Sequence, residues 1–314
     1  MKKISIIIPA HNEEKNIPLV YAELQDVFAK YAKEKYVFDI LFINDGSADD
    51  TIGAMEKLAN LDENVEYIDF SRNFGKEVAT TAGLNNCKGD ACIMLDADLQ
   101  HPVELIPEFI AAWEKGAEVV VGIRNKNKST GILKKIGSAI FYKTINKIAE
   151  VEIVPNSTDY RLLDRIVIEQ FNRFTETNRM TRALIDWLGF RRDFINFDAK
   201  ERIHGDASYN FWKLFKLAMN SFISLSLLPL KLAGNLGIAI TLISGVAGFY
   251  ILLGKYFFRT PFASTFSDSE NLAILLLFLV GIILMSIGLL ALYIANIHGE
   301  VINRPMYVVR KKKL

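Results

Sequence analysis

Short apolar runs alternate with amphipathic stretches in the first part of the chain. Runs rich in β-branched residues predict strands over residues 4–8, 38–43, 65–70, 91–95 and 118–121. Apolar residues at helical spacing predict helices between them, over residues 17–32, 51–61, 75–85 and 102–113. Strands that alternate with helices form a mostly parallel sheet covered on both faces, and such sheets bind ligands at the carboxyl ends of their strands. We therefore expect an α/β domain whose chemistry directly follows its apolar runs.

The later part of the chain has a different pattern, because long stretches of it carry no charge. Residues 232–254 and 272–297 are uncharged throughout. At about 1.5 Å of rise per residue, each is long enough to cross the roughly 30 Å of hydrocarbon in a bilayer. A pair of buried core helices is the alternative, but uncharged runs of this length are uncommon in soluble cores. The pattern predicts two transmembrane helices.

Residues 211–228, just before these runs, form an amphipathic pattern at helical spacing. Lys213 and Lys216 share its polar side. Such a helix lies in the membrane interface with its apolar face toward the acyl chains. A helix packed on the preceding domain is the alternative, and the two interpretations are compatible. Glycines within the uncharged runs, such as Gly237 and Gly281, permit close approach of helices, so a homo-oligomer is expected.

The net charge of +1, from 37 basic and 36 acidic residues, hides a basic C-terminus. Residues 299–314 hold five basic residues against Glu300. Basic segments beside a span stay in the cytoplasm, where they can meet anionic lipid, whereas residues 255–271 are balanced in charge and more easily translocated. Residues 1–3 lead straight into a predicted strand, so we expect no signal peptide. The expected location is the inner cell membrane, as a multi-pass protein with both termini and the first domain in the cytoplasm.

The two cysteines, Cys87 and Cys92, cannot form a disulfide framework and are expected to be reduced thiols. Neither of them is spaced with a histidine as zinc ligands are, which argues against a zinc cluster. No nucleic-acid partner is expected.

Unusual polar residues follow three of the predicted strands. They are residues 9–14 (PAHNEE), 44–47 (NDGS) and 96–102 (DADLQHP). Neither the dinucleotide fingerprint G-x-G-x-x-G nor the phosphate loop G-x-x-x-x-G-K-[ST] follows a predicted strand, so bound phosphates need another source of positive charge. Asp96 and Asp98 together can bind a hard divalent cation, whose coordination shell a nucleotide diphosphate would complete. A single Asp, such as Asp49 or Asp50, is more simply a helix N-cap or turn residue.

Five blocks of sequence resemble family 2 glycosyltransferases of the polyprenyl-phosphate type, which include bactoprenol glucosyltransferases and dolichol-phosphate mannose synthases. In family order they are IIIPAHNEE (6–14), INDGSADDT (43–51), SRNFGKE (71–77), LDADLQHP (95–102) and STDYRLLD (157–164). The resemblance implies a GT-A, Rossmann-like α/β fold with a mostly parallel sheet. Together with the hydropathy and charge patterns, it indicates four segments: a cytoplasmic catalytic domain (1–210), an amphipathic interfacial helix (211–229), a two-helix transmembrane hairpin (230–298) and a basic cytoplasmic tail (299–314).

The same resemblance implies a pocket for a nucleotide sugar. Its residues would be Pro9, His11, Glu13, Asp45, Lys76, Asp96 and Arg202. Asp45 would accept hydrogen bonds from base or sugar. For Lys76, the alternative is a solvated residue on the surface of a helix. Asp98 and Gln100 would bind Mg²⁺ or Mn²⁺, which neutralises charge on the departing nucleotide diphosphate. Relatives often read Gly-x-Ser-Lys-Tyr where residues 205–209 read GDASY, and the missing lysine leaves the donor sugar open.

The implied acceptor is a phosphate monoester on a long isoprenoid. Its second pKa is about 6, so it is largely ionised at pH 7 and can attack without losing a proton first. The site then chiefly needs cations that hold two anions together. The positions that resemble acceptor-phosphate ligands of the mannose synthases are Arg124, Lys134 and Ser138, with Lys135 open in place of Lys134 and a basic surface loop as the alternative.

Asp159 falls in the block in which relatives carry a catalytic carboxylate. It would take a residual proton from the acceptor or orient the sugar. A structural carboxylate at a strand end is the alternative.

The implied reaction is the metal-dependent, inverting transfer of a hexose from a nucleotide sugar, with UDP-glucose preferred over GDP-mannose. The acceptor would be undecaprenyl or dolichyl phosphate, and the product would serve cell-envelope glycan or glycoconjugate modification. A GDP-mannose-dependent dolichol-phosphate mannose synthase is the first alternative. A processive polysaccharide synthase is another, for which residues 170–174 (QFNRF) match Q-x-x-R-W imperfectly. The last alternative is a non-catalytic two-span adaptor that binds nucleotide sugars. An inactive relative should lack some of the site residues, whereas Asp45, Asp98 and Asp159 are all present in this chain.

Overall fold

The computed structural model describes residues 1–31, 35–125, 154, 156–176, 179–198 and 304–314, with scattered residues between 253 and 302. The chain divides into two compact units, one formed by Met1–Tyr209 with Asn303–Leu314 and the other by Asn210–Ile302. Within the described residues, no helix combines the length and the apolar composition that crossing a membrane requires. The two predicted spans and the interfacial helix fall mostly outside those residues and stay predictions.

The described residues of the first unit form an eight-stranded sheet in the order β7-β5-β6-β4-β1-β2-β3-β8. Its strands are β1 (Lys2–Ala10), β2 (Tyr36–Asn44), β3 (Val65–Phe70), β4 (Ala91–Met94), β5 (Val119–Arg124), β6 (Ser157–Asp164), β7 (Arg192–Phe197) and β8 (Val309–Lys313). β1 lies parallel to both β2 and β4, and β2 lies parallel to β3. The strand order therefore reverses beside β1, and the crevice at the carboxyl ends of the strands there is where open α/β sheets bind ligands.

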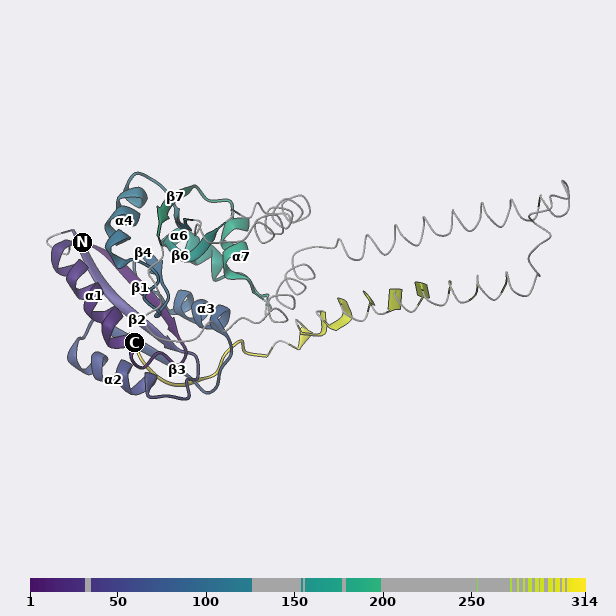
Figure 1. The fold of residues 1–314 in the computed structure, drawn as a ribbon, viewed down its shortest axis with the longest axis horizontal. Coiled ribbons are helices and arrows are strands. Elements are labelled where there is room, and N and C mark those ends of the chain that lie inside the picture. The colour runs from purple at the N-terminus through teal and green to yellow at the C-terminus, as the bar shows by residue number, and fades with distance from the viewer. Residues whose placement is uncertain are drawn as a thin grey trace. The chain divides into compact units, whose positions relative to one another are not determined.

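Helices cover both faces of this sheet (Figure 1). One face carries α1 (Asn16–Tyr31), α2 (Thr51–Leu61) and α4 (Ile106–Glu114), and the other carries α3 (Lys76–Asn86), α6 (Arg165–Phe171) and α7 (Thr181–Trp187). Strand β1 shows why, since Ile6 and Ile8 are buried in the first core and Ile7 in the second. The α/β fold, and the strands and helices predicted in the first part of the chain, are confirmed to within a few residues; the helix predicted over 102–113 opens with a short 3₁₀ turn, η1 (Val103–Leu105).

The sequence pattern did not predict the last three strands of the sheet, β6, β7 and β8, and of these β8 comes from the end of the chain. It pairs antiparallel with the edge strand β3 and is drawn in yellow in Figure 1. Its residues, VRKKK, are all exposed, so they lack the alternation of apolar and polar residues that marks a half-buried strand. The segment predicted as a basic tail over 299–314 thus ends as a charged sheet edge of the first unit.

Candidate active site

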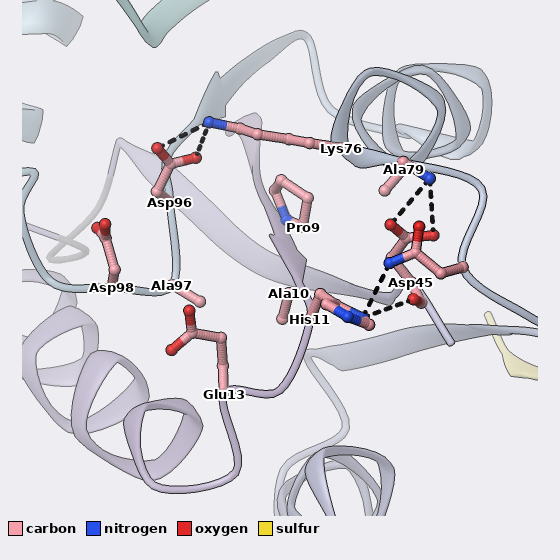
Figure 2. Close-up of a pocket in the computed structure, with 12 residues that line it drawn as sticks. Pro9, Ala10, His11, Glu13, Asp45, Lys76, Ala79, Asp96, Ala97 and Asp98 are labelled. Carbon is pink, nitrogen blue, oxygen red and sulfur yellow. Dashed lines mark hydrogen bonds and ion pairs between the residues drawn. The ribbon is translucent and has the colours of Figure 1, made fainter. Parts of the chain in front are cut away.

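A pocket opens at the carboxyl ends of β1, β2 and β4, beside the N-terminus of α3 (Figure 2). It is lined by Pro9, Ala10, His11, Glu13, Asp45, Asn73, Gly75, Lys76, Ala79, Asp96, Ala97 and Asp98. The predicted nucleotide-sugar residues that the structure describes are all in this group, and so is the predicted metal ligand Asp98. In Figure 2, Asp96 and Asp98 lie on one side of Pro9, and Asp45 lies on the other.

Asp45 holds the loop that forms one wall of the pocket, residues 71–75 between β3 and α3 (the 71–75 loop). Its Oδ1 accepts a hydrogen bond from Phe74 N at 2.7 Å, and its Oδ2 accepts one from Gly75 N at 3.0 Å. Burial raises the pKa of the Asp45 carboxyl, and the two N–H donors oppose that shift. Holding this loop is therefore the role that the contacts of Asp45 show, while its predicted hydrogen bond to base or sugar stays a prediction.

The turn after β4 carries the two carboxylates of the opposite wall. Asp98 is buried, and its Oδ1 accepts a hydrogen bond from Gln100 N at 3.1 Å. His101 stabilises the turn, because its Nδ1 accepts a hydrogen bond from Asp96 N at 3.0 Å. Burial lowers the pKa of His101, so the ring is neutral at pH 7 and stacks on Tyr160 with 5.0 Å between ring centroids. The turn is thus held rigidly by buried aromatic rings.

Lys76, at the start of α3, joins this turn to Asp159 on β6. Its Nζ lies 2.6 Å from Asp96 Oδ1 and 2.8 Å from Asp159 Oδ2. Burial alone would lower the pKa of Lys76, but the two carboxylates outweigh it and raise that pKa. Lys76 is therefore a charged, ion-paired residue beside the pocket, with 46% of its side chain exposed, and its predicted contact with the nucleotide sugar stays a prediction.

Asp159 is not among the residues that line the described pocket, and it reaches the pocket through Lys76. Arg182 Nε, on α7, lies 3.2 Å from Asp159 Oδ1. Burial alone would raise the pKa of Asp159, but the charges of Lys76 and Arg182 outweigh it and hold that pKa at about 2. Asp159 is therefore ionised at neutral pH.

Arg182 and Asn73 are site residues that the sequence analysis missed. Arg182 belongs to a segment with no recognised block, and it reaches Asp159 because α7 is tied to β6 by the buried ion pair of Arg161 with Asp186, at 2.8 Å. Asn73 lies inside the SRNFGKE block, and its amide nitrogen is 3.2 Å from His11 Nδ1. Of the two, only Asn73 had a signal in the sequence.

The remaining predicted residues stay apart from the pocket or cannot be placed. Arg124 ends β5, is half-buried and does not line the described pocket, and neither does Gln100. Lys134, Ser138 and Arg202 lie outside the described residues, as does the alternative Lys135. Within the part of the chain that the structure describes, no group of three His, Cys, Asp or Glu side chains could hold a metal ion. A cation at Asp98 would need oxygen ligands from a bound diphosphate.

Comparison with known proteins shows which family this chain belongs to. The model of glycosyl transferase family 2 matches residues 5–171. The Bacillus subtilis protein named uncharacterized glycosyltransferase YkcC is 37% identical over 307 residues, which are 98% of this chain and 93% of that protein. The SfII prophage-derived bactoprenol glucosyl transferase of Shigella flexneri is 37% identical over 309 residues, which are 98% of each. The chain therefore belongs to glycosyl transferase family 2 and is a glycosyltransferase with a GT-A fold.

Proposed function

We propose that this glycosyltransferase moves a hexose, with inversion, from a nucleotide sugar to a polyprenyl phosphate, with UDP-glucose as the first choice of donor. The observation that carries the proposal is the convergence of Asp45, Lys76 and Asp98 on one pocket from three separate segments. Relatives that bear the name bactoprenol glucosyl transferase and align over nearly the whole chain support the lipid acceptor.

The donor diphosphate needs cations beside the leaving group. Asp98 faces the pocket, and carboxylate and amide oxygens such as those of Asp98 and Gln100 are the ligands that Mg²⁺ and Mn²⁺ prefer. A divalent cation held there would neutralise charge on the departing nucleotide diphosphate. Lys76 supplies fixed positive charge on the other side of Asp96.

Asp159 then acts as a counterion and not as a proton acceptor. A carboxylate with a pKa of about 2 takes a proton poorly at neutral pH. The acceptor phosphate has a second pKa of about 6 and is largely ionised, so it can attack without a strong base. Asp159 therefore serves the reaction by orienting Lys76 and Arg182.

We further propose that the second unit anchors the protein in the inner membrane, with both termini in the cytoplasm and self-association through its helices. Described residues between 272 and 297 are helical, and many of them are exposed Leu and Ile side chains, among them Leu276, Ile287 and Ile294. Exposed apolar side chains at helical positions are what lipid contact requires.

A transfer assay with the purified full-length protein tests the proposal. With Mg²⁺, UDP-glucose and undecaprenyl phosphate, we expect a polyprenyl-phosphate hexose that mass spectrometry detects. The Asp98→Ala variant should lose at least about 100-fold in rate, and Asp193→Ala, which changes an exposed Asp of β7, should not. A product with GDP-mannose and none with UDP-glucose would establish the mannose synthase alternative, and tight nucleotide binding without any product would establish the adaptor.

A further inference from the structure

The C-terminal segment contacts the 71–75 loop directly. Ser71 N donates a hydrogen bond to Val308 O at 2.9 Å, and Arg310 Nη2 donates one to Ser71 O at 2.8 Å. Both backbone polar groups of Ser71 are therefore bound by residues that lie at the other end of the sequence. These contacts lie just beyond the paired residues of β3 and β8, which end at Phe70 and Val309.

Aromatic contacts extend this link toward Asp45. The ring of Tyr307 stacks on Phe70 with 4.9 Å between centroids, and Phe70 meets Phe74 edge to face at 5.7 Å. Phe70 is fully buried, so its position is fixed by what packs on it. Phe74 N is the donor of the 2.7 Å hydrogen bond to Asp45 Oδ1. Two ring contacts thus join the end of the chain to the wall of the pocket.

The other side of the loop is fixed by β2 and the turn that follows it. A Cβ on Gly46 would lie 2.2 Å from the carbonyl carbon of Arg72, so only glycine permits this approach. Asn44 Nδ2 donates to Asp69 Oδ1 at 2.7 Å, and Arg310 Nη1 lies 4.0 Å from Asp69 Oδ2. The loop is therefore held between residues 44–46 and the C-terminal segment.

We propose that Tyr307 and Arg310 are positioning residues for the nucleotide sugar. They hold the 71–75 loop in the conformation that presents its residues to the pocket, and they do so without touching the donor. The inference rests on the proposed function, which places the donor in this pocket. A strand that merely protects the sheet edge is the competing explanation.

The far half of the same strand offers a matched control. Lys311 Nζ donates to Glu56 of α2 at 2.6 Å, and Lys313 Nζ donates to the carbonyl of Ala59. These residues support the edge strand but do not contact the loop through any of these bonds. Edge protection alone would make both halves of β8 equally important for binding.

The test measures UDP binding and steady-state kinetics of the full-length protein. We expect Tyr307→Ala and Arg310→Ala to raise the Kd for UDP and the KM for UDP-glucose by about fivefold or more, with kcat within about twofold of the wild-type value. Tyr307→Phe keeps the ring and should restore binding. Lys311→Ala and Lys313→Ala should leave both constants close to wild type, even where they lower the melting temperature.

Amide hydrogen exchange without nucleotide gives a second readout, because it reports local opening of the loop. We expect Phe74 N–H and Gly75 N–H to exchange faster in Tyr307→Ala than in Lys311→Ala. Equal exchange and equal Kd in both variants would overturn the inference. If the wild-type protein bound no nucleotide while the exchange difference was present, the donor assignment would be refuted and the positioning of the loop supported.

Discussion

At residue 76 a lysine lies between two carboxylates, one in the turn after β4 and the other on the neighbouring strand β6. Its Nζ is within 2.8 Å of both Asp96 and Asp159. We expect Lys76→Ala to lower kcat/KM by about 100-fold or more, because it removes a fixed positive charge beside the departing diphosphate. Lys88→Ala, which breaks the surface pair with Glu66, is the control. A loss confined to thermal stability, with kcat/KM unchanged, would show that Lys76 is purely structural.

The depressed pKa of Asp159 predicts how stability depends on pH. The folded pKa of about 2 lies below the ordinary value of 3.8, so the ionised side chain stabilises the fold at pH values above that ordinary value. This stabilisation is lost as the pH falls from about 4 to about 2. The free energy of unfolding of the wild type should therefore exceed that of Asp159→Asn by on the order of 2 kcal/mol at pH 7. Thermal denaturation should show this difference shrinking as the pH falls from about 4 to about 2. A constant difference from pH 7 to pH 2 would contradict it.

Residues at strand ends were predictable, because parallel strands bring their carboxyl ends to one edge. Asp45 and Asp98 follow apolar runs directly, and the structure places both in the pocket. Arg182 was not predictable, since its place beside Asp159 depends on the packing of α7 and on the buried ion pair of Arg161 with Asp186, two residues that are 25 positions apart.

At the scale of elements, the turn after β2 allows a specific prediction about Gly46. Gly46 has φ of 58°, and an added Cβ would meet the backbone of Arg72. We expect Gly46→Ala to destabilise the protein and to weaken UDP binding, because the 71–75 loop must move. Gly189→Ala is the control, since its φ of 72° is also left-handed but nothing lies within 4 Å of the new Cβ.

The two alanine variants separate backbone strain from the close contact. Gly189→Ala should lose only the left-handed cost of about 1 to 2 kcal/mol, and Gly46→Ala should lose about 1 to 3 kcal/mol more. Denaturation midpoints and UDP titrations measure both effects. Equal losses of stability and unchanged UDP binding in the two variants would mean that the loop is not clamped by Gly46.

At this scale strands β1 to β5 and helices α1 to α4 could be predicted, because their apolar periodicity is strong and local. Strands β6, β7 and β8 were not predicted. β6 was noticed only as a sequence block, and β8 carries four basic residues among five, so neither propensity nor pattern indicates a strand there. It forms because β3 offers an open edge for pairing.

For the whole molecule, the main difference from the sequence analysis is that the chain returns to its first unit. The predicted segments ran from domain to anchor to tail, whereas Asn303–Leu314 belongs with Met1–Tyr209. Hydropathy can predict where apolar segments occur, but it carries no information on which edge a charged segment pairs with.

The proposed membrane topology can be measured by cysteine labelling in intact cells. Ser264→Cys, between the predicted spans, should react with a membrane-impermeant maleimide, and Leu314→Cys should react only after permeabilisation. The native cysteines, Cys87 and Cys92, are buried and should give little background. Labelling of Leu314→Cys in intact cells would contradict a cytoplasmic C-terminus.

The most direct test of the central claim is whether a divalent cation and the nucleotide bind together beside Asp98. Electron paramagnetic resonance of Mn²⁺, titrated into the full-length protein with and without UDP, measures this binding. The account predicts nucleotide-dependent Mn²⁺ binding by the wild type and by Asp193→Ala, and its loss in Asp98→Ala. Undiminished Mn²⁺ binding by the Asp98→Ala variant in the presence of UDP would contradict the account.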